Sequence, residues 1–128
     1  MKNGEVQPGN KALGVQGEAI ALKYLQKLRY TILEQNYRCR CGELDIIARE
    51  GKTVVFVEVK TRKNLSYGPP QLSVTPFKQR QISKAALTYM AQKRLEGTNA
   101  RFDVIAILLE NIEAPHIDHI TNAFDLAY

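Results

Sequence analysis

Two charged residues, Glu58 and Lys60, lie inside an apolar run that is typical of a buried strand. The run covers residues 54–62 and reads Val-Val-Phe-Val-Glu-Val-Lys-Thr-Arg, a density of β-branched and aromatic side chains that favours a strand. Residues i and i+2 of a strand project from the same face, roughly 7 Å apart at ~3.3 Å rise per residue. Burial of a charge is costly unless the charge is paired or binds a ligand, so the pattern indicates a functional site.

A third charged residue, Asp45, interrupts a second apolar run over residues 43–49. The turn sequence Glu-Gly-Lys at 50–52 predicts that this run and the following strand form an antiparallel hairpin. With the turn centred near Gly51, paired residue numbers sum to about 102 or 103, so Asp45 is expected opposite Val57 or Glu58. Side chains are expected to alternate, with Glu43, Asp45 and Ile47 on one face and Leu44, Ile46 and Ala48 on the other.

Two carboxylates that converge in this way repel each other, and one takes up a proton unless a cation lies between them. A hard divalent ion such as Mg²⁺ suits Asp45 and Glu58, with the backbone carbonyl of Val59 and water as further ligands. Lys60 could then orient a metal-activated water and offset charge on a phosphorane-like transition state. The set therefore predicts phosphodiester hydrolysis. The alternative is a Glu58–Lys60 surface pair at a frayed strand end, beside an unrelated Asp45.

The elements that must position these residues follow from hydrophobic periodicity and from cap and turn signals. We expect an amphipathic helix over 11–28 that is capped near Asn10, and a strand over 30–37. After a polar loop over 61–74, Thr75 and Pro76 predict the start of a second helix, which runs to about Leu95 and is ended by Gly97. Its apolar residues are expected to include Phe77, Ala85, Met90 and Leu95. A strand over 101–109 and a short element over 117–124 complete the chain.

The element order α-β-β-β-α-β predicts an α/β protein with a mixed sheet flanked by helices. At 128 residues and 45% hydrophobic composition, the chain is expected to form a single domain over 1–128, with 1–10 flexible. It has no apolar run of ~18 residues, and its polar start does not resemble a signal peptide. These features predict a cytoplasmic protein without membrane association.

Cys39 and Cys41 form one Cys-Arg-Cys sequence. We interpret them as two reduced thiols beside a strand, because a zinc site would need two further ligands. His116 and His119 are the available candidates for those ligands. Both histidines are instead expected to be ordinary polar residues of a C-terminal strand.

Positive charge gathers in the middle of the chain, which also holds the Glu58–Lys60 strand. Residues 1–28 carry four basic and two acidic side chains (+2), residues 29–101 carry fourteen and six (+8), and residues 102–128 carry none and five (−5). That distribution suits a polyanionic partner such as nucleic acid. The predicted phosphate contacts are Arg62, Lys63, Lys78, Arg80 and Lys84. A merely solvated basic face is the alternative. Tyr67, in the loop after the strand, could stack on a base or pack internally.

The motifs also resemble a known family. The segments Gly42-Glu43-Leu44-Asp45-Ile46-Ile47-Ala48 and Val55-Phe56-Val57-Glu58-Val59-Lys60-Thr61-Arg62 are similar to those of the YraN-type family of small bacterial proteins. That family belongs to the restriction-endonuclease-like superfamily and is similar to archaeal Holliday-junction resolvases. The resemblance extends over nearly the whole chain, through Gly14-Val15-Gln16-Gly17-Glu18, Asn36-Tyr37-Arg38, Tyr67-Gly68-Pro69, Lys78 and Arg101-Phe102-Asp103-Val104.

The resemblance implies a restriction-endonuclease-like core in which Asp45 and Glu58 are metal ligands and Lys60 is the catalytic lysine. It adds Glu18 as a helix carboxylate that completes the acidic cluster, while Gly17 before it would allow close approach of helix and sheet. Glu43, which shares the face of Asp45, is expected to support the site. The chain departs from the superfamily motif by having Leu44 in place of proline before Asp45, which leaves the acids intact.

The function implied is that of an endonuclease that depends on Mg²⁺ or Mn²⁺ and hydrolyses DNA phosphodiesters, with branched or junction DNA among its expected substrates. Two competing classes remain: a non-catalytic nucleic-acid-binding protein that retains the nuclease fold, and an interaction protein whose basic stripe docks an acidic partner. A homodimer would suit a two-fold junction, but no segment identifies an interface.

Overall fold

The computed structural model describes residues 8–64, 74–111 and 113–126. In chain order its elements are α1 (Pro8–Lys27), β1 (Thr31–Cys39), β2 (Gly42–Glu50), β3 (Thr53–Arg62), α2 (Pro76–Gln92), β4 (Ala100–Leu108) and β5 (His116–Phe124). The α/β class and the order α-β-β-β-α-β are confirmed. The short element expected over 117–124 is a nine-residue strand, so the order ends in two strands.

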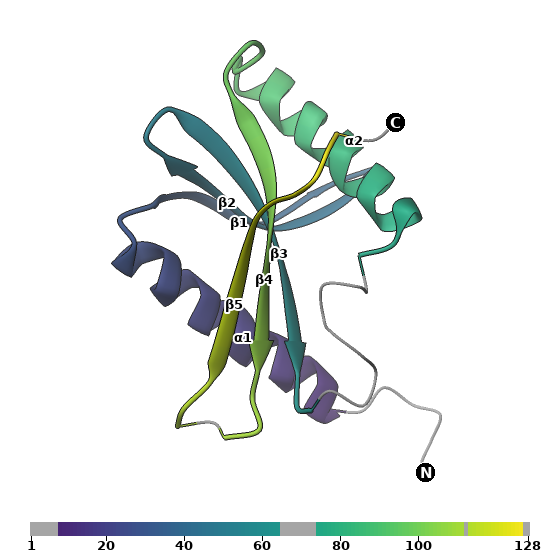
Figure 1. The fold of residues 1–128 in the computed structure, drawn as a ribbon. Helices are drawn as coiled ribbons and strands as arrows, with labels where there is room; N and C mark the ends of the chain where they lie inside the picture. Colours follow the sequence, from purple (N-terminus) through teal and green to yellow (C-terminus); the bar gives the residue numbers. More distant parts are fainter. Residues whose placement is uncertain (1–7, 65–73, 112, 127–128) are drawn as a thin grey trace.

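The strands form one mixed sheet in the order β1-β2-β3-β4-β5. Only β3 and β4 pair in parallel, and α2 makes the crossover between them, whereas the other neighbouring pairs are antiparallel hairpins. Figure 1 shows α1 and α2 on opposite faces of this sheet. Because both faces are covered, β3 and β4 read as nearly continuous apolar runs.

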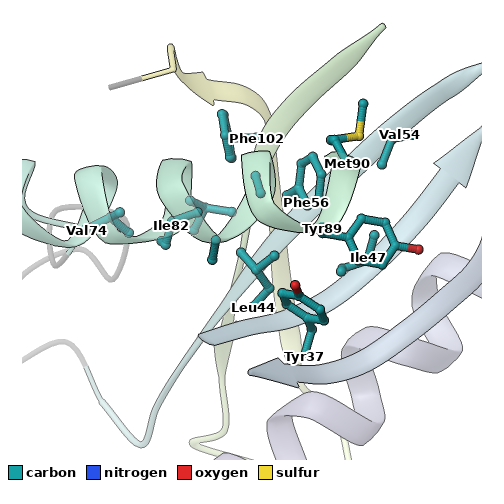
Figure 2. Close-up of a cluster of buried hydrophobic side chains, with 13 residues drawn as sticks. Tyr37, Leu44, Ile47, Val54, Phe56, Val74, Ile82, Tyr89, Met90 and Phe102 are labelled. Atoms are coloured by element: carbon teal, nitrogen blue, oxygen red, sulfur yellow. The ribbon is translucent and has the colours of Figure 1, made fainter. Parts of the chain in front are cut away.

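Each helix covers its own apolar cluster. On the α2 face, Phe56 and Tyr37 pack edge-on against Tyr89, and Phe102 and Met90 extend the cluster (Figure 2). On the α1 face, Ala21 and Leu25 pack onto Ile46, Val57, Ile105 and Ile107. Burial of one such side chain stabilises the fold by about 1.5–3 kcal/mol, so the two clusters fix the sheet between the helices.

Helix boundaries differ from the expected ones by a few residues. α1 begins at Pro8, before the predicted cap at Asn10. Thr75 caps α2 as predicted, since its Oγ accepts a hydrogen bond from the Lys78 N–H at 3.2 Å. α2 ends at Gln92 and not near Leu95. The left-handed backbone that closes the turn occurs first at Arg94 (φ 57°) and then at Gly97 (φ 86°).

The predicted facing of one side chain in β2 is wrong. Leu44 packs on the α2 face together with Ile47, not with Ile46 and Ala48, because regular alternation in β2 breaks at Asp45. Phe77 is 62% exposed and takes no part in the core.

Tyr67 lies outside the described residues. Neither described helix combines the length and the apolar character needed to cross a membrane.

Candidate metal site

At Asp45 the sheet divides into two pairs of strands, and this point of division is the fork. The β2–β3 ladder runs from Glu50 paired with Thr53 to Ile46 paired with Val57, which confirms the predicted register sum. Beyond that point β2 continues with β1 as far as Gly42 paired with Cys39, while β3 continues with β4 as far as Arg62 paired with Leu108. The two pairs of strands diverge in Figure 1. Asp45 therefore lies on one arm of the fork, and Glu58 and Lys60 lie on the other.

The Asp45 side chain bridges the two arms. Its Oδ2 accepts a hydrogen bond from the Val59 N–H at 2.8 Å, replacing the backbone acceptor that a continued ladder would supply. Asp45 also lies close enough to Glu58 for its negative charge to raise the pKa of that residue. The expected convergence of the two acids is thus present in the structure.

Two lysines from different elements reach Glu58. Lys60 Nζ lies 3.2 Å from Glu58 Oε2, and Lys78 Nζ from the first turn of α2 lies 3.9 Å from the same oxygen. The Glu58 side chain is only 7% exposed, whereas those of Lys60 and Lys78 are 21% and 37% exposed. A buried carboxylate thus faces two cations that remain in contact with solvent.

Glu18 approaches the fork from α1. An added Cβ at Gly17 would lie 1.8 Å from the Thr61 Oγ1, so only glycine allows α1 this close to β3, as the sequence predicts. Burial, followed by the negative charges of Asp45 and Glu43, raises the pKa of Glu18. Glu18 is therefore part of the electrostatic surroundings of the acid pair.

Burial dominates the electrostatics of the pair itself. It raises the pKa of Asp45, and the opposing hydrogen bond from Val59 does not cancel the effect. Burial, together with repulsion by Asp45, raises the pKa of Glu58 from 4.5 to about 7, although Lys60 and Lys78 act in the other direction. The pKa values of both acids are therefore raised where they converge. Two carboxyl groups that repel each other in this way mark a place where a cation would be favourable.

The two carboxyl groups suit a hard divalent ion that takes few of its ligands from the protein. Mg²⁺ is usually held by one or two carboxylates and completes its shell with water and substrate phosphate oxygens. Asp45 and Glu58 supply that pair. Within the described ranges, no three His, Cys, Asp or Glu side chains are grouped to hold a metal, so the structure does not unite Glu18 with the pair as a third ligand.

The remaining predicted site residues differ in how close they lie to the fork. Glu43 pairs with Arg38 at 3.4 Å on the exposed side of β2, and reaches the site only through its charge. Arg62 ends β3 and Lys63 follows it. Arg80 and Lys84 are exposed on α2. Of the five predicted phosphate contacts, Lys78 forms an ion pair with an acid of the site.

Sequence reasoning missed a second buried acid, Asp103, which is 0% exposed. Arg101 donates to both of its oxygens, from Nε at 3.0 Å and Nη2 at 3.2 Å. His119 Nε2 lies 2.7 Å from Oδ2, and the Asn122 N–H donates to Oδ1 at 3.0 Å. The signal was available, because Asp103 interrupts an apolar run just as Asp45 does.

His119 is consequently not the ordinary polar residue that the sequence suggested. Its side chain is 8% exposed, and its Nδ1 lies 3.1 Å from the Tyr24 hydroxyl of α1. His116, at 68% exposed, agrees with the expectation. Cys39 and Cys41 are free. They lie at the β1 end of the sheet, at the opposite edge from β5, so the zinc alternative with the two histidines has no geometric basis.

Comparison with known proteins identifies relatives over nearly the whole chain. The profile of the "Uncharacterised protein family UPF0102" matches residues 17–107. A UPF0102 protein of Geotalea daltonii is 64% identical over 125 residues, covering 98% of each chain. One of Geobacter sulfurreducens is 62% identical over the full length of both. One of Chlorobium phaeobacteroides is 46% identical over 88% of this chain and 92% of its own.

Proposed function

The chain belongs to the UPF0102 family, and on that premise we propose that it is a metal-dependent nuclease that hydrolyses DNA phosphodiesters. The observation that carries the proposal is the fork, where a buried Glu58 and a half-buried Asp45 converge from adjacent strands beside Lys60. Although Lys60 and Lys78 face Glu58, burial and repulsion by Asp45 still raise its pKa.

Each residue of the fork has a role that follows from its position. Asp45 and Glu58 would hold Mg²⁺ or Mn²⁺, with the Val59 carbonyl as a further donor. Such an ion, when bound, supplies an activated water and neutralises charge on the phosphate. Lys60 would orient the attacking water and offset charge on the phosphate oxygens. Lys78, more exposed, would contact a phosphate of the substrate.

The proposal is tested by cleavage of linear duplex, single-stranded, flapped and four-way-junction DNA with Mg²⁺ or Mn²⁺. We expect Lys60→Ala to retain metal binding while losing about 10²–10³ in rate, as removal of one transition-state donor typically does. The matched control is Lys52→Ala, in the turn at the far end of β3, which should cleave like the wild type.

Cleavage of none of these substrates with either metal would contradict the proposal. Steep loss of DNA affinity with salt in that case would favour the non-catalytic binding protein. An interaction protein would show neither cleavage nor salt-dependent binding of DNA.

A further inference from the structure

An aromatic side chain is exposed beside the candidate metal site. Phe77 is the second residue of α2, and 62% of its surface is accessible. The next residue is Lys78, whose ammonium lies 3.9 Å from Glu58. The two residues are neighbours in the first turn of the helix, so the backbone of Phe77 adjoins that of Lys78.

Phe77 continues into an exposed basic stripe along α2. Arg80 and Lys84 follow it at i+3 and i+7, which places all three on one side of the helix, and all three are exposed. The opposite side of α2 is buried through Ile82, Ala85, Ala86 and Tyr89. Within the described ranges, the ion pairs do not include Arg80 or Lys84. The stripe therefore carries an aromatic ring and two uncompensated cations.

The chemistry of this stripe suits one strand of nucleic acid. Arginine and lysine contact successive phosphates without reading sequence, and an exposed aromatic ring offers a face on which a base stacks. Bases within a duplex already stack on their neighbours, so only an unpaired base can use such a ring. The proximity of Phe77 to Lys78 and Glu58 places that base next to the phosphate at the fork.

We propose that Phe77 stacks on an unpaired base beside the phosphate held at the fork, while Arg80 and Lys84 follow the backbone of the same strand. The substrate class is then nucleic acid with unpaired bases at the cleaved bond, which includes single strands, flaps and branch points. This inference rests on the proposed function, in which a substrate phosphate lies at the fork. It adds Phe77 to that function as a specificity-determining residue.

Binding is measured with a labelled single-stranded oligonucleotide and with the blunt duplex of the same sequence, with Ca²⁺ in place of Mg²⁺ to limit cleavage. We expect Phe77→Ala to weaken single-strand binding about tenfold, the effect of losing one stacked base, and to leave duplex binding within about twofold. Phe77→Trp should restore single-strand binding. Leu87→Ala is the matched control, because Leu87 is 42% exposed further along the same helix. It should bind like the wild type.

A fluorescent base analogue in the single strand gives a second readout, since stacking on Phe77 quenches it and Phe77→Ala should abolish the quenching. Equal loss of single-strand and duplex binding, or no loss of either, would overturn the inference, even if the wild type cleaves DNA. Selective loss without any cleavage by the wild type would support Phe77 stacking while contradicting the nuclease proposal. Absence of binding to either oligonucleotide would overturn the inference whatever the partner of this surface is.

Discussion

Two buried acidic sites share this sheet, and they differ in whether the fold compensates their charge. Hydrogen bonds from His119 and Arg101 outweigh burial and lower the pKa of Asp103 below 3.8. At the fork, burial and repulsion by Asp45 raise the pKa of Glu58 to about 7. Both acids are buried, Asp103 completely and Glu58 to 6% exposure. Only Glu58 keeps a raised pKa, although Lys60 and Lys78 face it.

The difference separates a structural acid from a candidate functional one. Asp103 joins β4 to β5, and the same cluster reaches α1 through the hydroxyl of Tyr24 on His119 and the segment after α1 through that of Tyr30 on Arg101. It ties the sheet to the helix that carries Glu18. Asp45 ties β2 to β3 through the hydrogen bond that its carboxylate accepts from the Val59 N–H, in a region where the ladder between those strands has ended.

Loss of the Asp103 charge should give the largest effect on stability. Asp103→Asn leaves the Arg101 guanidinium without its bidentate partner, and removing one member of a buried pair typically costs about 3–5 kcal/mol in the free energy of unfolding. Asp118→Asn is the control. Asp118 is exposed on β5 beside His116, so the change should stay within about 0.5 kcal/mol. Chemical denaturation measures both. A cost below 1 kcal/mol for Asp103→Asn would show that this cluster does not anchor the fold.

Loss of the Glu58 charge should act in the opposite direction. The rise of its pKa from 4.5 to about 7 corresponds to an upper limit of about 3 kcal/mol at 1.36 kcal/mol per pKa unit. Glu58→Gln should therefore make the metal-free protein more stable at pH 8 by up to that amount, while removing metal binding. Glu96→Gln, an exposed acid between α2 and β4, should leave stability unchanged. Destabilisation by Glu58→Gln at pH 8 would mean that the fold compensates this acid after all.

The two sites should also give opposite dependences on pH. Because the folded pKa of Glu58 is raised, the unfolded chain loses the proton first, and stability without metal should fall as pH rises from about 4.5 to 7. Because the folded pKa of Asp103 is lowered, its contribution is present above 3.8 and is lost as pH falls through the lower folded value. Urea denaturation across this range, with chelator present, checks both signs. A Glu58→Gln variant that keeps the fall between 4.5 and 7 would assign it to other groups.

The smallest effect expected here concerns the helix that joins the two sites. Gly17→Ala places a methyl group against Thr61 and should cost about 1–3 kcal/mol by overpacking, offset in part by the helix preference for alanine. Gly14→Ala, three residues earlier with nothing within 4 Å of the added Cβ, should be neutral or stabilising by up to about 1 kcal/mol. Thermal unfolding of the two variants provides the comparison. Equal behaviour would show that α1 has room to move away from β3.

Much of the fork could be predicted from local sequence. Alternating apolar runs and a Gly51 turn are sufficient to set the hairpin register and hence to bring Asp45 opposite Glu58. Gly17 beside Thr61 was equally accessible, since a glycine before a site residue suggests close approach. These features depend on neighbours in the chain, where strand geometry leaves little freedom.

The parts that sequence could not supply depend on distant contacts. Asp103 meets His119 across the β4–β5 pair, and its partner Arg101 meets the hydroxyl of Tyr30; no periodicity encodes such meetings. Phe77 satisfies the helical pattern of apolar residues, yet it points to solvent because the N-terminal end of α2 extends beyond the core. In both cases the tertiary surroundings decided the role of the side chain.

The central claim is that the uncompensated acid pair at the fork binds a divalent metal and the compensated Asp103 does not. Crystals soaked in Mn²⁺ test this claim most directly through anomalous difference density. The account predicts a peak between Asp45 and Glu58, within about 2.0–2.4 Å of a carboxylate oxygen from each, and its loss in Glu58→Gln. Density absent from the fork under saturating Mn²⁺, or present instead at Asp103, would contradict it.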